Sequence, residues 1–285
     1  MPELPEVEAA RRATRRIAAR RRITDVWCAD DPIVFERVPA ARFRKALRGR
    51  TVLDVHRHGK HLWLELDRRP WPCLHFGMAG GVHTRIERSS SGARAVKLMS
   101  SRRRSDDGWP PRFAKLRLTL DNGAELVVAD ARRLGRIRLR DDPAKEPPIA
   151  LLGFDALLSV PPPAPFVEML RARGAPIKAV LLDQAFAAGV GNWIADEVLY
   201  QARIDPRRRA STLSPEEARR VRRALIMIIT TAVQAGANSD RFPRAWLFHY
   251  RWEKGRGTSK DARGKTIRHE TIGGRTTAWV PAIQR

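Results

Sequence analysis

The first eight residues carry groups that could do covalent chemistry on a sugar. The chain opens Met-Pro-Glu-Leu-Pro-Glu-Val-Glu. If Met1 is removed, Pro2 offers a secondary α-amine, and because such amines titrate at ~8, a useful fraction is unprotonated at neutral pH. Attack of this amine on a sugar C1′ or aldehyde gives a cationic iminium, which is an electron sink for β-elimination. Glu3 is placed to protonate the ring oxygen or to transfer protons, and Glu6 to hold the segment or to position water.

A simpler interpretation is that Pro2 and Glu3 only lead into a capped helix. Pro5 suits the first helical position, and Glu6 and Glu8 suit the positive end of the helix dipole. The first three residues alone favour this interpretation, whereas the complete run of eight favours the nucleophile.

Positive charge is spread along the chain, with 55 Lys and Arg against 31 Asp and Glu, a net charge of +24 and a pI near 11.5. This excess indicates a polyanionic partner, unless it reflects only an arginine-rich composition. No apolar run approaches the ~20 residues that cross a bilayer, and the opening has no secretory signal pattern. Cys28 and Cys73 cannot build a four-thiolate zinc site, so we expect buried free thiols in a reducing cytoplasm, with the protein at the nucleoid if it is bacterial.

Apolar spacing divides the chain into a β-rich part and a helical part. Residues 4–20 have helical spacing, with arginines on the other face. From 22 to 140 the spacing switches to two, with turns at residues 58–60 and 121–123, which predicts a mainly antiparallel, two-layer β-sandwich. Beyond residue 165 the spacing is helical, and residues 214–217 (Ser-Pro-Glu-Glu) form a capping box.

Two segments interrupt these patterns. Residues 88–112 are rich in Ser, Arg and Gly, and we expect a mobile loop whose Arg102, Arg103 and Arg104 are solvated or touch phosphate. Residues 141–165 hold seven prolines, which is typical of a linker. We therefore expect an α+β fold with two domains, divided as a sandwich domain 1–142, a linker 143–165, a helical domain 166–237 and a C-terminal segment 238–285.

Five motifs occur in a fixed order along the chain after the N-terminal one. They are 57–60 (Arg-His-Gly-Lys), 75–78 (His-Phe-Gly-Met), 130–135 (Asp-Ala-Arg-Arg-Leu-Gly), 182–184 with 189–197, and 273–277 (Gly-Gly-Arg-Thr-Thr). Together with the opening, this order resembles the formamidopyrimidine-DNA glycosylase / endonuclease VIII family over nearly the whole chain. The resemblance implies that 166–237 is a helix–two-turn–helix domain and that the C-terminus forms a β-hairpin finger.

The resemblance also implies roles for single residues. Pro2, Glu3, Glu6 and Lys60 would form the catalytic set, and Lys60, His75, Asn192 and Arg275 would bind DNA phosphates. A base in a duplex must be extruded before its sugar is attacked, which leaves a gap in the stack. The gap would be filled by three wedge residues, namely Met78, Arg132 and Leu134. The family often has Phe where Leu134 stands, so damage search or opposite-base selectivity is expected to differ.

The C-terminal segment departs from the bacterial pattern of the family. Residues 246–285 contain no cysteine, so they resemble the zincless finger of a subgroup best known from plants and fungi. We expect neither zinc nor any other cofactor, and packing in place of metal by Trp246, Phe248, Trp252, Ile267, Ile272 and Trp279. The loop 238–245 is short where many bacterial relatives have a longer one that closes over 8-oxoguanine.

The resemblance predicts a monomeric, bifunctional DNA glycosylase/AP lyase of base excision repair. It would remove formamidopyrimidines and hydantoins, and 8-oxoguanine more weakly, from duplex DNA through a Pro2 Schiff base with β- and δ-elimination. One alternative is a non-catalytic DNA-damage-binding protein on the same scaffold, and another is an RNA or ribosome binder. The proline and its carboxylates argue against the first alternative, because binding needs no free amine, and the wedge segments argue against the second.

Overall fold

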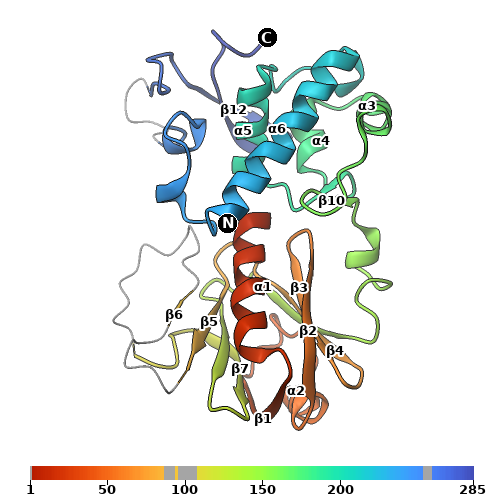
Figure 1. Cartoon of the computed structure of the whole chain (residues 1–285), viewed down its shortest axis with the longest axis vertical. Coiled ribbons are helices and arrows are strands. Elements are labelled where there is room, and N and C mark those ends of the chain that lie inside the picture. The colour runs from red at the N-terminus through yellow and green to blue at the C-terminus, as the bar shows by residue number, and fades with distance from the viewer. Residues whose placement is uncertain (1, 87–93, 96–107, 253–258) are drawn as a thin grey trace. The chain divides into compact units, whose positions relative to one another are not determined.

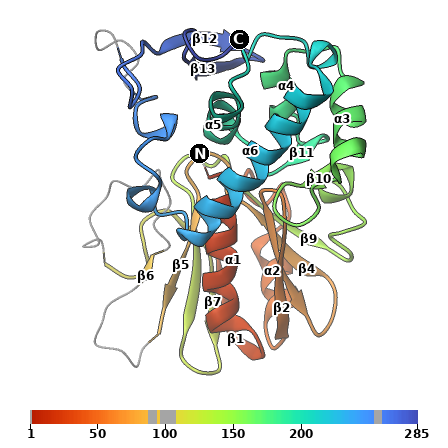
Figure 2. The same ribbon diagram turned by 45° about the horizontal axis from the view of Figure 1, so that its top comes forward.

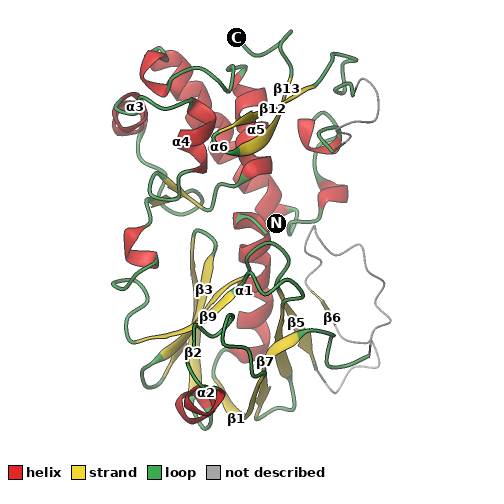
Figure 3. Cartoon of the chain, turned by 180° about the vertical axis from the view of Figure 1, so that it is seen from behind, coloured by secondary structure: helices red, strands yellow, loops and turns green. Residues whose placement is uncertain are grey.

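The computed structural model describes residues 2–86, 94–95, 108–252 and 259–285, so Arg102, Arg103 and Arg104 lie outside the described residues. The chain folds into two compact units. The N-terminal unit comprises Met1–Leu151 and Gly236–Asn238, and the C-terminal unit comprises Leu152–Ala235 and Ser239–Arg285. Strands dominate the first unit and helices the second (Figure 3). The boundary falls inside the segment predicted as a linker, which itself carries short structured elements.

In the described part of the chain, the N-terminal unit consists of nine strands joined in one hydrogen-bonded series, with helices beside them (Figure 1). Its elements are α1 (Leu4–Ala18), β1 (Arg21–Cys28), α2 (Ala40–Leu47), β2 (Thr51–His58), β3 (His61–Leu66), β4 (Trp71–His75), β5 (Gly81–Arg85), β6 (Arg94–Ala95), β7 (Ala114–Leu120), β8 (Glu125–Ala129), β9 (Arg136–Arg140) and the 3-10 turn η1 (Ile149–Leu151). The order is β6-β5-β8-β7-β1-β2-β3-β4-β9, and β1 pairs with both β2 and β7. Leucines and valines from the strands on both sides of β1 share one core with α1 and α2, which confirms the predicted antiparallel sandwich.

Local sequence accounts for the elements that carry the N-terminal motifs. The buried positions of α1 include Leu4, Val7, Ala10 and Ile17, as its helical spacing predicts. The helix ends two residues earlier than expected, because Arg20 adopts a positive φ of 62° and begins the turn into β1. Both predicted hairpins form, as β2–β3 and β7–β8.

The C-terminal unit is mainly helical (Figure 2). Its elements are β10 (Phe154–Asp155), α3 (Pro163–Arg171), α4 (Ile177–Leu182), β11 (Ala187–Ala188), α5 (Asn192–Ala202), η2 (Ala210–Thr212), α6 (Pro215–Gln234), η3 (Ser239–Arg241), η4 (Leu247–His249), β12 (Arg268–Ile272) and β13 (Arg275–Trp279). Ser214 and Glu217 form the predicted capping box of α6. The β12–β13 hairpin packs on α5, so the predicted finger is present and rests on a buried helix.

Two further expectations concern the cysteines and the membrane. Cys28 and Cys73 are buried and unpaired, as predicted, and burial raises the pKa of these thiols to about 11 and about 12 respectively. Within the described ranges, every helix is too short or too polar to span a bilayer.

Candidate functional site

The N-terminal unit places two carboxylates beside Pro2. Pro2, Glu3 and Glu6 are all buried, and Glu6 is fully so. The backbone N–H of Glu3 donates to Oε2 of Glu6 at 2.9 Å, while Oε1 of Glu6 has no hydrogen-bond partner among the described residues. Burial raises the pKa of Glu6 to about 7, and the neighbouring Glu3 carboxylate adds to the rise. Glu6 can therefore accept or release a proton near neutral pH, a property that the sequence did not reveal.

A buried ion pair ties the Lys60 turn to the helix that follows Pro2. Arg57, whose side chain is 1% exposed, donates from Nε to Oε2 of Glu8 at 3.1 Å and from Nη1 to the carbonyl oxygen of Gly59 at 3.0 Å. Burial alone would raise the pKa of Glu8, but hydrogen bonds from Arg11 and the charge of Arg57 more than offset it and lower that pKa to about 2. The charged pair thus fixes the backbone of the turn immediately before Lys60.

His75 lies at the end of β4 as a neutral side chain. Burial lowers its pKa to about 4, and the charge of Lys60 adds to this effect. The backbone N–H of Gly77 donates to Nδ1 of His75 at 3.3 Å, so the ring proton of the neutral side chain sits on Nε2. His75 can therefore offer an uncharged N–H donor, which suits a phosphate oxygen.

The three wedge residues lie on two loops of this unit that touch through their backbones. Met78 and Leu134 are 40% and 45% exposed, which is unusual for apolar side chains of this size. Arg132 is also exposed. Gly77 has a φ of 57°, and a Cβ there would lie 2.4 Å from the carbonyl carbon of Leu134. Asp130 closes the second loop by accepting from the backbone N–H of Arg132 and of Gly135.

The C-terminal unit brings Asn192 and the finger hairpin together. Asn192 begins α5, and its Nδ2 donates to the carbonyl oxygen of Thr276 at 2.8 Å, next to the exposed Arg275. Gly273 and Gly274 turn the hairpin with φ values of 60° and 72°, and a Cβ at Gly273 would lie 2.9 Å from the Cβ of Ala179. Helix start and hairpin tip thus form one polar surface within this unit.

A buried charged cluster, absent from the sequence prediction, holds this finger. Asp196 of α5 accepts from Lys178 and Arg251 and from the backbone N–H of Ala278, and Lys178 also donates to the backbone oxygen of Asn192 at 3.0 Å. Lys178 and Asp196 are 0% and 1% exposed. An aspartate inside the apolar run 193–199 was the available signal, because such a residue needs buried partners.

The predicted packing of aromatic and aliphatic side chains around the finger holds for five of six residues. Trp246, Phe248, Ile267, Ile272 and Trp279 are buried. Trp252 is 55% exposed, so it packs only in part, with its ring in an edge-to-face contact with Phe248 at 5.6 Å between ring centres. Its neighbour Arg251 turns inward to Asp196 instead, and the guanidinium carbon lies 4.5 Å from the centre of the Trp252 ring.

Known protein families match the sequence of both units. The family profile for the formamidopyrimidine-DNA glycosylase N-terminal domain matches residues 1–137, and that for the H2TH domain of the same enzyme matches residues 152–243. A formamidopyrimidine-DNA glycosylase of Arabidopsis thaliana is 42% identical over all of this chain and 71% of its own length. One from Thermus thermophilus is 32% identical over all of this chain and 98% of its own.

Solved structures show the same fold. A Lactococcus lactis Fpg bound to DNA containing an oxidised pyrimidine matches with a TM-score of 0.80 and 24% identity over the whole of both chains. These findings define a DNA glycosylase of base excision repair. The chain belongs to the formamidopyrimidine-DNA glycosylase family.

Proposed function

We propose that this chain is a bifunctional glycosylase/AP lyase in which the amine of Pro2, freed by loss of Met1, attacks C1′ of a damaged nucleotide in duplex DNA. The observation that carries the proposal is the buried Glu3–Glu6 pair beside Pro2, with the pKa of Glu6 raised to about 7. Structural neighbours named as bound to abasic-site DNA and to DNA with a formamidopyrimidine lesion support the substrate class.

The chemistry proceeds by bond exchange at C1′. The Pro2 nitrogen bonds to C1′ as the C1′–N glycosidic bond breaks, and the proton lost from that nitrogen leaves with the base. The nitrogen lone pair then opens the ring by breaking C1′–O4′, Glu3 supplies the proton to O4′, and the iminium forms. Loss of a C2′ proton and of the 3′-phosphate completes β-elimination, loss of a C4′ proton and of the 5′-phosphate completes δ-elimination, and water hydrolyses the iminium and returns the amine. Glu6 exchanges protons with this site, and because the amine supplies the electron sink, the proposal includes no metal or organic cofactor.

Binding would divide between the two units. In the N-terminal unit Lys60 and His75 hold phosphates, and Met78, Arg132 and Leu134 fill the gap left by the extruded base. In the C-terminal unit Asn192 at a helix start and Arg275 at a hairpin tip hold phosphates. Borohydride trapping on abasic-site DNA tests the whole proposal, since Pro2→Gly or a blocked N-terminus should abolish or cripple formation of the covalent adduct. Binding of damaged DNA by the processed chain without any adduct would instead support a non-catalytic damage-binding protein.

The proposed substrate range rests on the short 238–245 segment. We propose that formamidopyrimidines, hydantoins and abasic sites are processed faster than 8-oxoguanine, because little chain is available there to close over that base. Single-turnover rates on matched duplexes measure this order, and a faster rate on 8-oxoguanine would reverse it.

A further inference from the structure

The segment between β1 and α2 has no part in the proposed chemistry, yet it is attached to a loop that carries two wedge residues. We define this segment, residues 31–37, as the 31–37 turn. Asp31 is 5% exposed, and its Oδ1 accepts from the backbone N–H of Ile33 and of Val34 at 3.1 and 3.2 Å. The carboxylate therefore shapes its own turn and remains available on its other lone pairs.

Asp31 also binds the middle of the wedge loop, residues 130–135. Arg133 donates from Nε to Oδ2 and from Nη2 to Oδ1 of Asp31, both at 3.0 Å, which is a bidentate pair. Lys115 donates to Oδ2 at 2.8 Å. Burial opposes the charged form of Asp31, but the hydrogen bonds from Arg133 and Lys115 hold its pKa well below the usual range.

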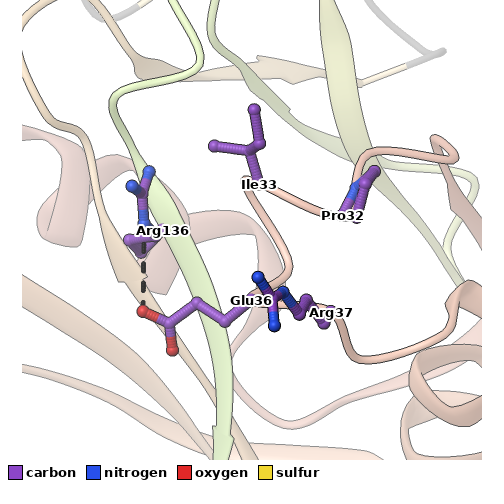
Figure 4. A pocket seen from close by; sticks show the side chains of 5 residues that line it. All are labelled: Pro32, Ile33, Glu36, Arg37 and Arg136. Carbon is purple, nitrogen blue, oxygen red and sulfur yellow. Dashed lines mark ion pairs between the residues drawn. The ribbon is translucent and has the colours of Figure 1, made fainter.

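Three more contacts attach the turn to the strand that leaves this loop. The backbone N–H of Ile137 donates to the carbonyl oxygen of Val34 at 2.8 Å. Glu36 accepts from Nε of Arg138 at 2.9 Å and lies 3.8 Å from Nε of Arg136. Figure 4 shows this Glu36–Arg136 pair in an open hollow of about 390 Å³ lined by Pro32, Ile33, Glu36, Arg37 and Arg136. The turn therefore holds the wedge loop at its centre and at its exit.

The held residue lies between two wedge residues. Arg133 adopts a left-handed φ of 56°, which a non-glycine residue takes up only when its surroundings hold it. Its neighbours Arg132 and Leu134 are exposed, and the backbone of Leu134 rests against Gly77, next to Met78. Fixing Arg133 thus fixes the backbone from which Arg132 and Leu134 project, and which rests against Gly77.

We propose that Asp31 is a positioning residue that holds the wedge loop, through Arg133, in the conformation that inserts into the duplex. This inference rests on the proposed wedge role of Arg132 and Leu134. Asp31 acts on DNA only through the loop, because its own carboxylate is buried against Arg133 and Lys115.

Asp31→Asn tests this inference, since asparagine keeps the shape and the Oδ1 acceptor but loses the charge. Arg133→Gln breaks the same pair from its exposed side, with less risk to folding. Asp30→Asn is the matched control, because Asp30 is the exposed neighbour and changes the net charge equally. The substrate is a duplex with a tetrahydrofuran abasic analogue opposite 2-aminopurine, at one fixed salt concentration, alongside the intact duplex.

We expect Asp31→Asn and Arg133→Gln to lose about tenfold in affinity for the analogue duplex relative to the intact duplex and to lose the 2-aminopurine fluorescence change. For Asp31→Asn, removing a negative charge should by itself tighten DNA binding, as Asp30→Asn should show, so the expected loss has the opposite sign. Arg133→Gln removes a positive charge, so its loss on the analogue duplex is judged against its loss on the intact duplex. The double variant should be no weaker than either single variant.

The remaining outcomes separate the proposed wedge role of Arg132 and Leu134 from the proposed positioning role of Asp31. If Arg132→Ala with Leu134→Ala leaves the fluorescence change intact, the proposed wedge role fails. If that pair abolishes the change but Asp31→Asn and Arg133→Gln do not, the positioning role of Asp31 is overturned. Equal losses on both duplexes, together with a lowered Tm, would show a structural effect only and would overturn it as well.

Discussion

The two units hold the wedge loop and the finger, respectively, with similar sets of charges in different solvent environments. Asp31 in the first unit and Asp196 in the second each accept from one lysine, one arginine and backbone N–H groups. The Arg133 side chain is 47% exposed, whereas those of Lys178 and Arg251 are 0% and 6% exposed. Half-solvated pairs contribute little to stability, but a broken buried cluster leaves an uncompensated charge. The wedge loop is therefore held by a buried carboxylate, 4% exposed, whose arginine partner is half exposed, and the finger by a cluster that is buried throughout.

Buried glutamates extend the comparison. Burial raises the pKa of both Glu6 and Glu197 to about 7. Glu197 accepts from Gln201 and from the backbone N–H of Phe248, so its oxygens are used inside the unit. Oε1 of Glu6 has no hydrogen-bond partner in the described part of the chain. The raised pKa thus accompanies a structural role for Glu197 and, in our proposal, a role in proton transfer for Glu6.

Asp196→Asn should have the largest effect on folding. It leaves Lys178 and Arg251 buried without their carboxylate, so we expect a loss of about 3–5 kcal/mol in the free energy of unfolding. Urea denaturation measures this loss. Glu216→Gln, which breaks an exposed, solvent-screened pair with Arg223, should cost far less. Equal costs for the two variants would show that burial of the Asp196 cluster adds nothing to its contribution to stability.

Substitutions of Glu6 and Glu197 should have different effects on the pH dependence of base excision. Glu6→Gln should slow base excision by about 10²-fold or more and remove a pH dependence near 7, whereas Glu197→Gln should leave the shape of the rate profile unchanged. Because the folded-state pKa of each acid is raised, each stabilises the fold fully below its unfolded pKa of 4.5 and loses that contribution as pH rises through about 7. Either substitution should therefore flatten the decline of stability between these values. A pH profile altered only by Glu197→Gln would reverse the assignment.

The smallest effect concerns the Lys60 turn. Arg57→Met should weaken binding of abasic-site DNA and lower the salt-dependence slope by about 1, as Lys60→Ala should, because both lose one phosphate contact. The double variant should resemble Lys60→Ala alone. Additive losses in fluorescence-anisotropy titrations across a salt series would show that Arg57 does not act through Lys60.

Local sequence predicted the elements of the site better than the groups that hold them. The Gly273–Gly274 turn, the start of α5 at Asn192 and the β2–β3 hairpin all follow from neighbouring residues. Asp31 and Arg133 lie 102 positions apart, and Asp196 and Arg251 lie 55 apart. No local spacing relates such residues, because only the tertiary fold brings them together. The partial exposure of Trp252 could not be predicted for the same reason, since it depends on tertiary packing.

The identity of the nucleophile is the central claim, and mapping the trapped adduct tests it most directly. Borohydride-reduced protein–DNA adduct can be digested with trypsin and nuclease, and the modified peptide located by mass spectrometry. We predict sugar remnant on the Pro2 nitrogen, exclusively in chains that have lost Met1. Modification of a lysine instead, or equal trapping in chains that retain Met1, would contradict the account.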